Sequence, residues 1–450
     1  MERLLAQSAC SPVPVRGTFT WLLAVALCGC AGCGDGASSE AGEDAGGETE
    51  ASLPVAGDRA KSPFAADIRD SADIRIVENP RPADDSRLPW RIGSEPSVSI
   101  GEYEGDDPYI LHQANDAVML PDRRIVVANM GTNEIRLYDA QGVHQITWGG
   151  TGGGPAEFQG LTGIALWPGD SVFAWEVGRS SSGRADLWGG SVFDLAGNLG
   201  RSFQIESDDG QGLQPRVVLA SGEILGRRTT GGAEDGYWRM EAAYSLVARE
   251  GAAELSFGTH PGLEGFRGVY SGVMLHIARM AYSRGLHETA WEGMLVITTD
   301  DRYELRAYRM SDGALARIVR REHSSRAPTR AEVVDAMLNA FIEAEQPEEV
   351  IEMFRPAYDE VPIVEDFPAF RALLADALGH LWVREYTPPD IERPAPLWTV
   401  FDPGGQVLGF VETPADFEVF EIGADYLLGR ATDEIGIERI QAWELERVGG

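Results

Sequence analysis

The stretch RIVVANMGTNEIRLYDAQG, from Arg124 to Gly142, decides the fold of this chain. An apolar run over 125–129 leads through a Gly-Thr-Asn turn into a second run over 134–138, which ends before an Asp-Ala-Gln-Gly turn. Apolar runs of this length, bounded by Gly and Asn, predict two adjacent antiparallel strands. Because one such pair of strands cannot bury its apolar face alone, the unit must stack on further copies of itself.

The same pattern returns five more times along the sequence. Its period is roughly 45 to 60 residues, close to the length of one propeller blade that carries loop insertions. The 53 Gly and 25 Pro among 450 residues are typical of a β protein rich in turns. The sequence therefore predicts an all-β fold, a six-bladed β-propeller. The further copies pair 171–176 with 191–197, 223–228 with 244–251, 294–298 with 304–308, 380–384 with 398–402, and 426–430 with 439–443.

An N-terminal strand is expected to complete the last blade. The lead-in over 65–89 contains several prolines, and we expect it to be extended. Residues 91–100 then alternate between apolar and polar types, as a half-buried strand does. The last repeat ends without an obvious fourth strand, so this segment is the natural partner. Pairing the two ends of the chain leaves no long exposed sheet edge.

A helical insertion is predicted at 329–355, between the fourth and fifth blades. Thr329 and Glu332 form a capping box, and an apolar helical face follows from Val333 to Ile342. A second short helix over 348–355 is expected to stop at Pro356. We expect the apolar stripe to pack on the propeller, with a lid or a partner-binding helix as the alternative.

The first 29 residues are typical of a lipoprotein signal peptide. A basic start precedes a short apolar run over 19–27, and the sequence Leu-Cys-Gly-Cys that ends at Cys30 resembles a bacterial lipobox. We expect Cys30 to be lipidated, with Cys33 as a second register and an ordinary cleaved signal as the alternative. All four cysteines lie within the first 33 residues, so no disulfide framework is expected in the propeller at 65–450.

Composition and charge bear on the cellular location and disfavour nucleic acids as partners. Residues 30–64 are mostly Gly, Ala, Ser, Glu and Asp, which predicts a disordered acidic tether. The net charge of −33 repels phosphate backbones and disfavours nucleic-acid binding. We expect a monomer in the cell envelope, attached by a lipid to the outside of the inner membrane or to the outer membrane, with an unknown protein or carbohydrate partner.

A family resemblance rests on two motifs. The loop Gly149–Phe158, GGTGGGPAEF, resembles the G-x-G-x-G-P-G-E-F loop of NHL-like six-bladed propellers, although Ala156 replaces the second Gly of that pattern. Residues 133–142 are similar to the second half of an NHL repeat. The helical insertion, Trp382-Val-Arg and Phe401-Asp-Pro-Gly-Gly resemble features of an exported bacterial lipoprotein group with this fold. The resemblance covers about 90–446 and implies the fold, but no reaction.

One level of the predicted disc is a candidate ligand site. Ligands of propellers usually bind at the face where the loops after the second strands open. Aligning the second strands puts several polar or aromatic side chains near that face, where Arg suits carboxylate or phosphate oxygens and Trp offers a stacking surface. They favour an anionic sugar or peptide, whereas structural ion pairs between blades are the alternative. The candidate binding residues are Trp175, Arg227, Arg384 and Arg430, with Asn129 and Glu176 at the next position.

A metal-dependent enzyme is the runner-up interpretation. Lactonases of the gluconolactonase and regucalcin type hold a divalent cation through Glu, Asn and Asp at the channel mouth, and oxygen ligands suit calcium. This chain offers Asn115, Asp116, Asn129, Glu176 and Asp300 for that role. We expect instead a non-catalytic binding or scaffold propeller, with no catalytic residues, no resident metal and no cofactor, and with calcium only in the lactonase alternative.

Overall fold

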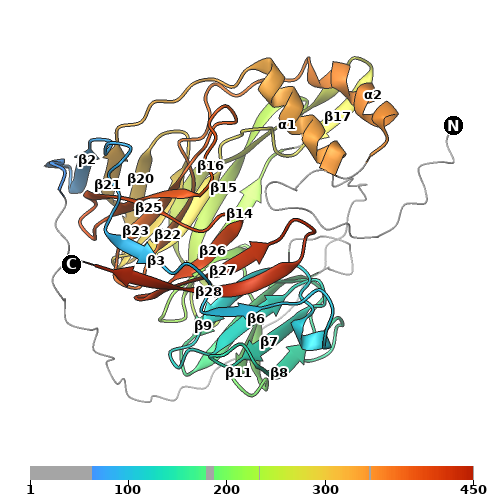
Figure 1. Ribbon diagram of the computed structural model, residues 1–450, viewed down its shortest axis with the longest axis vertical. Coiled ribbons are helices and arrows are strands. Elements are labelled where there is room, and N and C mark those ends of the chain that lie inside the picture. Colours follow the sequence, from blue (N-terminus) through green and yellow to red (C-terminus); the bar gives the residue numbers. More distant parts are fainter. Residues whose placement is uncertain (1–62, 179–186, 233, 344–345, 449–450) are drawn as a thin grey trace.

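Six β-sheets and two α-helices make up most of the computed structural model, which describes residues 63–178, 187–232, 234–343 and 346–448 (Figure 1). The stretch from Arg124 to Gly142 forms two adjacent antiparallel strands, as predicted. The next repeat forms the second sheet in the same way. The first two sheets are β5 (Ala114–Met119), β6 (Ile125–Asn129), β7 (Glu134–Tyr138) and β8 (His144–Gly149), then β9 (Leu161–Trp167), β10 (Ser171–Gly178), β11 (Leu187–Asp194) and β12 (Leu199–Gln204).

The third sheet is longer than the repeat pattern indicated. Two of its strands extend well beyond the other sheets and pair over much of their length, and a fifth strand follows them. Gly-rich runs without clear alternation gave no period from which this extension could be predicted. Its strands are β13 (Gln214–Val218), β14 (Ile224–Thr230), β15 (Gly236–Val247), β16 (Ala253–Tyr270) and β17 (Val273–Ile277).

The remaining three sheets follow the repeats in order. Each begins with a strand that pairs antiparallel with the apolar second strand of its repeat. Their strands are β18 (Leu286–Trp291), β19 (Met294–Thr299), β20 (Glu304–Arg309) and β21 (Leu315–Arg321); β22 (Phe370–Ala375), β23 (Leu381–Glu385), β24 (Leu397–Phe401) and β25 (Val407–Glu412); and β26 (Phe417–Ile422), β27 (Tyr426–Thr432) and β28 (Glu438–Arg447).

The sheets are arranged like the blades of a propeller around their first strands. Each first strand contacts the first strand of the next sheet, in the order β5, β9, β13, β18, β22 and β26, and β26 contacts β5. Buried hydrophobic clusters fill the spaces between neighbouring sheets. Three tryptophans, Trp148, Trp167 and Trp382, each lie in one of these clusters.

The strand predicted at 91–100 pairs with the last repeat, but as two short pieces. These are β3 (Trp90–Ile92) and β4 (Val98–Ile100), and both pair antiparallel with β28. In Figure 1 the blue β3 lies beside the red β28. Residues from the two ends of the described chain therefore share one sheet.

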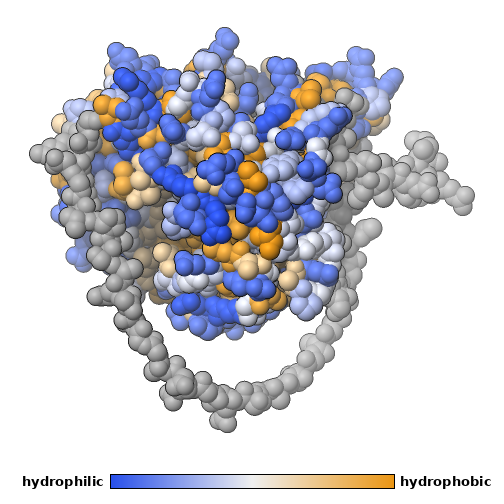
Figure 2. Space-filling model, turned by 60° about the horizontal axis from the view of Figure 1, so that its bottom comes forward, coloured by the Kyte–Doolittle hydropathy of each residue, from blue (hydrophilic) through white to orange (hydrophobic). Residues whose placement is uncertain are grey.

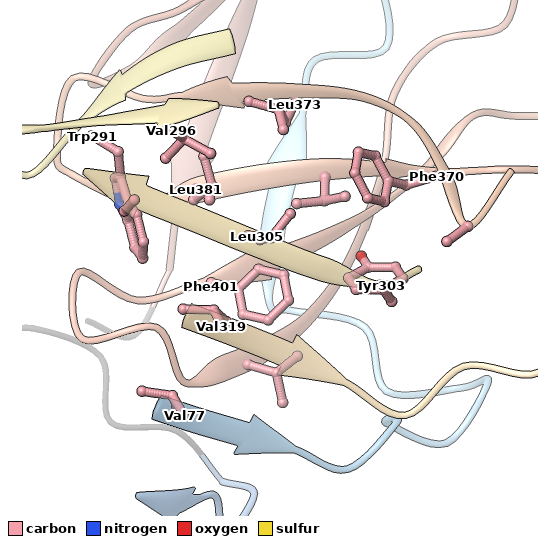
Figure 3. Packing of buried hydrophobic residues seen from close by; sticks show 14 residues of the cluster. Val77, Trp291, Val296, Tyr303, Leu305, Val319, Phe370, Leu373, Leu381 and Phe401 are labelled. Atoms are coloured by element: carbon pink, nitrogen blue, oxygen red, sulfur yellow. The ribbon is translucent and has the colours of Figure 1, made fainter. Parts of the chain in front are cut away.

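The lead-in is a hairpin and not merely an extended segment. Its strands β1 (Asp67–Ser71) and β2 (Ile74–Asn79) pair with each other, and β2 runs parallel to β21 at the edge of the fourth sheet. The prolines begin only after β2, so they remove no hydrogen bond from this pairing. Val77 is fully buried with Val319 and Phe401 between the fourth and fifth sheets (Figure 3).

The helical insertion forms where it was predicted, with one difference at its end. α1 (Arg330–Glu343) and α2 (Glu348–Tyr358) lie between β21 and β22 in the chain. α2 continues through Pro356, which was expected to end it. Val333 and Met337 are buried against Phe266 and Leu275 of the third sheet's extension, so the apolar stripe packs on the β-structure.

Candidate functional site

The aligned side chains of the second strands face the following sheet. Arg227 of β14 reaches Glu288 of the fourth sheet, and Arg430 of β27 reaches Asn115 of the first. Trp175 packs in the cluster between the second and third sheets. Side chains alternate between the two faces of a sheet along each strand. Aligned positions of the second strands therefore point to the same face of their sheets. The level inferred from the sequence is thus a set of positions between neighbouring sheets.

Arg227 belongs to a buried ion-pair network. Its Nη1 lies 2.9 Å from Glu288 Oε1, and Arg216 Nη2 lies 3.1 Å from Glu288 Oε2. The Tyr244 hydroxyl donates a hydrogen bond to the same carboxylate. Burial alone would raise the pKa of Glu288, but the two arginines outweigh it and hold this pKa at about 2. This geometry agrees with the structural alternative for Arg227.

Arg430 is held in a similar way by acidic partners. Its guanidinium lies 2.6 Å from Glu418 Oε2 and 3.1 Å from Glu438 Oε1, and it donates to the side chain of Asn115. Glu438 also accepts the backbone N–H of Ala114 at 2.8 Å. Arg430 therefore joins the sixth sheet to the first.

Arg384 differs from the other two arginines. It is half-buried, and it makes no hydrogen bond or ion pair with any residue of the described chain; Glu418 is the nearest compensating charge. Strand pairing places Phe370 opposite Glu385 and Ala372 opposite Arg384, with Arg371 in the bulge between them. Arg371 and Arg384 are therefore neighbours on the paired strands β22 and β23 of the fifth sheet.

Arg279 brings a third cation to the same place. Burial lowers the pKa of Arg371 to about 10, and the charges of Arg279 and Arg384 add to this effect. Burial also lowers the pKa values of Arg279 and Arg384. All three groups stay charged at neutral pH, so positive charge is concentrated in a partly desolvated place.

The surroundings of Arg279 include a histidine and a carboxylate. A Cβ atom built on Gly285 would lie 3.9 Å from Arg279 Nη2 and 3.5 Å from both Asp300 Oδ2 and His287 Nε2. Asp300 itself accepts the backbone N–H of Gly285 at 2.7 Å and contacts His287 at 3.1 Å. A glycine at this position keeps space open beside the arginine.

Asn129 and Glu176 hold loops in the structure. The buried Asn129 accepts the backbone N–H of His112 at 2.7 Å and donates to the Thr132 hydroxyl at 2.7 Å. Glu176 accepts the backbone N–H of Gln159 at 2.7 Å and lines a small cavity of about 240 Å³ beside the glycine-rich loop. Trp175 stacks on Phe173 with ring centroids 5.6 Å apart.

Two of the oxygen ligands proposed for calcium accept hydrogen bonds in the structure. Asp116 Oδ2 accepts the backbone N–H of Ile164 at 3.0 Å, and Asn115 accepts from Arg430. Within the described ranges, no three or more His, Cys, Asp or Glu side chains converge as a metal ion requires. The residues named for the lactonase alternative thus join strands and loops.

Sequence reasoning identified Arg384 but missed Arg279 and Arg371. The alignment compared second strands only, and Arg371 is on a first strand, where alternation into the channel could have revealed it. Arg279 follows β17 in an irregular segment, and only the fold of the third sheet brings it to the fifth. No periodicity in the sequence could have indicated that approach.

The surface and the N-terminus add two observations. Figure 2 shows one face of the molecule, where hydrophilic residues predominate and hydrophobic ones form small separate groups.

In the portion of the chain that the structure describes, no helix is long and apolar enough to cross a bilayer. The predicted signal peptide, Cys30 and nearly all of the tether lie outside the described residues.

The known proteins and structures that were compared with this chain have low similarity to it. No family model and no curated protein sequence matches the chain. A member of the DUF4221 family from Bacteroides vulgatus has 8% identity and a TM-score of 0.46 over 79% of this chain and 98% of its own. A Bacteroides fragilis protein provisionally described as exported has 8% identity and a TM-score of 0.42, over 82% of this chain and 99% of its own. An aldose sugar dehydrogenase from Streptomyces coelicolor has 13% identity and a TM-score of 0.36, over 80% of this chain and 100% of its own. At these scores the architecture rests on the strand pairing of this chain.

Proposed function

We propose that this chain is a closed six-bladed propeller that binds a small carboxylate ligand at the mouth of its channel and catalyses no reaction. The ring of contacts among six first strands supports the blade count. The pairing of β28 with β3 and β4 supports closure by the N-terminal segment. Both features are expected of a propeller that leaves no open sheet edge.

The observation that carries the binding proposal is the group formed by Arg279, Arg371 and Arg384. Asp300 compensates part of the positive charge of Arg279 and Arg371. Desolvation of the group costs free energy, and a bound anion offsets part of that cost. Guanidinium forks match the geometry of a carboxylate, because two parallel N–H groups meet its two oxygens. Arg384 supports this role best, since no carboxylate of the described chain forms an ion pair with it.

The ligand class is defined by a carboxylate, from either an acidic sugar or the C-terminus of a peptide. Isothermal titration of the protein with glucuronate and with an acetylated dipeptide distinguishes these sources. Glucose and the amidated dipeptide are the matched neutral controls. Binding of one acid without its neutral analogue supports the proposal, and equal binding of acid and neutral analogue contradicts it.

Two arginine variants test the site itself. Arg384→Gln removes the charge and keeps most of the side-chain volume, so we expect at least about a tenfold loss of carboxylate affinity. Arg309→Gln is the control, because Arg309 is exposed, is paired with Asp312, and lies at the other end of the fourth sheet. Unchanged affinity in the Arg384→Gln variant would exclude this site.

We also propose that a lipid on Cys30 holds the propeller at the cell envelope. The apolar segment and the lipobox-like sequence support this, and the acidic tether gives the domain reach from the membrane. Metabolic labelling with a fatty-acid analogue should be lost in Cys30→Ser and retained in Cys33→Ser. Labelling that persists without Cys30 contradicts the assignment.

A further inference from the structure

A cavity of about 350 Å³ lies between the fourth and fifth sheets. Its walls come from four separate segments: Arg81 shortly after β2, the loop after β21, the approach to β22, and the end of β23 with the loop that follows it. Its volume is within the range of small-molecule sites. None of the three arginines of the channel mouth lines it, so it is a second place on the molecule.

Most charged groups that line this cavity already have ion-pair partners. Arg81 lies 2.6 Å from Asp84, Arg326 is paired with Glu332 and Asp390, and Glu385 is paired with Arg321. Arg393 is the lining arginine that forms no ion pair with a described residue. One cation without an ion-pair partner favours an anion over a cation at this place.

Glu385 contributes little free negative charge to the cavity. Its two oxygens lie 2.8 and 2.9 Å from the guanidinium of the fully buried Arg321. The Tyr303 hydroxyl donates to it at 2.9 Å, as does the Thr399 hydroxyl at 2.7 Å. Glu385 is therefore already neutralised from behind the cavity wall.

Arg326 and Arg393 have different roles in the lining. Arg326 is fixed by Glu332 and Asp390, each at 2.7 Å, and its guanidinium lies 4.8 Å from the centre of the Phe367 ring. Arg393 is half-buried and makes no hydrogen bond or ion pair with the residues that the structure describes. Its planar donors remain available to a ligand in the cavity.

His323 adds a second available polar group. Its ring lies 5.9 Å from that of Tyr303, and neither of its nitrogens is hydrogen-bonded to a described residue. His323 is exposed at the rim of the cavity, and the partial desolvation of its ring lowers the pKa of the imidazole. The charged groups around it are Arg321 and Arg81, which lower its pKa further, and Glu385 and Asp366, which oppose them.

The other side of the cavity is apolar. Tyr386 stacks on Phe367 with an interplanar angle of 25° and a centroid distance of 5.4 Å. Pro388 and Ile391 continue this surface, and Ile391 is 48% exposed although it is aliphatic. A flat apolar group can cover this surface while a charged end reaches Arg393.

We propose that this cavity binds a small organic monoanion, a carboxylate attached to a flat apolar group. The carboxylate accepts hydrogen bonds from Arg393 and from His323, and the apolar group lies on Tyr386 and Ile391. The one lining arginine without an ion pair to a described residue, Arg393, matches one negative charge on the ligand. A dianion would leave a second charge without compensation.

Benzoate is the probe for this site, with benzamide as its neutral analogue of the same shape. Ligand-observed NMR or calorimetry with the full chain should detect benzoate and not benzamide. Arg393→Gln should weaken benzoate at least about tenfold, because it removes the charged donor. Arg309→Gln should leave the affinity unchanged. Equal binding of benzamide, or no loss in Arg393→Gln, would refute the proposal.

Two further measurements separate this site from the channel mouth and test the charge match. Arg384→Gln should leave benzoate affinity unchanged, and a loss there would assign benzoate to the mouth. Protonation of His323 adds a positive charge, so benzoate should bind more tightly as the pH falls from 8 through the lowered pKa of His323, and His323→Gln should remove this dependence. Phthalate, a dianion at pH 8, should bind no more tightly than benzoate; tighter binding contradicts the monoanion assignment.

Discussion

Asp116 and Glu421 are half-buried carboxyl groups that join neighbouring sheets through backbone N–H groups. Asp116 Oδ2 accepts from Ile164 of the second sheet at 3.0 Å, and Glu421 Oε2 accepts from Met119 of the first sheet at 3.0 Å. Burial raises the pKa of Asp116 to about 7 and also raises the pKa of Glu421. The negative charge of Glu421 contributes to the shift of Asp116.

Asp116→Asn should change how stability depends on pH. The folded-state pKa of Asp116 lies above its unfolded value of 3.8, so its contribution is full at low pH and is lost as pH rises through 7. The amide keeps an oxygen acceptor for Ile164 and cannot ionise. Between pH 5 and 8, the variant should gain about 2 kcal/mol in unfolding free energy relative to wild type, measured by urea titration. A difference independent of pH would contradict the shifted pKa.

Arg430 and Arg384 should differ in their effect on stability. Arg430→Ala leaves Glu438 half-buried without its ion-pair partner, and we expect a loss of about 2 kcal/mol in unfolding free energy. Arg384→Ala breaks no ion pair with a described residue, so its loss should stay under about 1 kcal/mol. Urea unfolding of both variants measures the difference. Equal losses would show that Arg384 has a structural role like that of Arg430.

At the scale of an element, the helical insertion combines a start that its own sequence encodes with a packing surface that comes from another sheet. The capping box forms as its sequence predicts: the Thr329 N–H donates to Glu332 Oε2 at 2.7 Å, and the Glu332 N–H donates to Thr329 Oγ1 at 3.3 Å. The surface against which the helices pack did not follow from their own sequence. They lie on β16 and β17, because the extension of the third sheet reaches them.

Thr329→Ala should weaken the start of α1. Loss of the side-chain acceptor leaves an N-terminal N–H unsatisfied and costs about 1 kcal/mol. Amide hydrogen exchange over the first turn of α1 should become faster accordingly. Thr329→Ser keeps the hydroxyl and should retain the wild-type protection. Unchanged exchange in the alanine variant would mean that packing of the apolar stripe alone fixes this end.

For the whole molecule, the pairing of β4 with β28 brings together positions that are far apart in the sequence. Ser99 and Gln441 are opposite each other, and Gln441 Nε2 lies 3.4 Å from Ser99 Oγ. The sixth sheet thus joins β3 and β4, from the N-terminal part of the chain, to the last strand, β28. Its stability depends on N-terminal residues that no local repeat specifies.

A disulfide between these positions tests the closure. Ser99→Cys combined with Gln441→Cys should oxidise and raise unfolding free energy on the order of 3 kcal/mol, because the bond restricts a very long loop in the unfolded chain. Comparing oxidised with reduced protein in a denaturant titration measures the gain. The Ser99→Cys single variant controls for the native cysteines. Failure of the pair to form a bond would argue against this register.

The sequence by itself determined the local features of this protein. Apolar periodicity and turn residues predicted the repeated strand pairs, and the capping box predicted α1, because these signals act between residues close in the chain. The alignment of repeats also placed Arg227, Arg384 and Arg430 at one level. Only the tertiary structure decided which of these arginines meets a carboxylate from another sheet, since that depends on contacts between distant segments. For the same reason it alone brought Arg279 and Arg371 to Arg384, and Arg393 to His323.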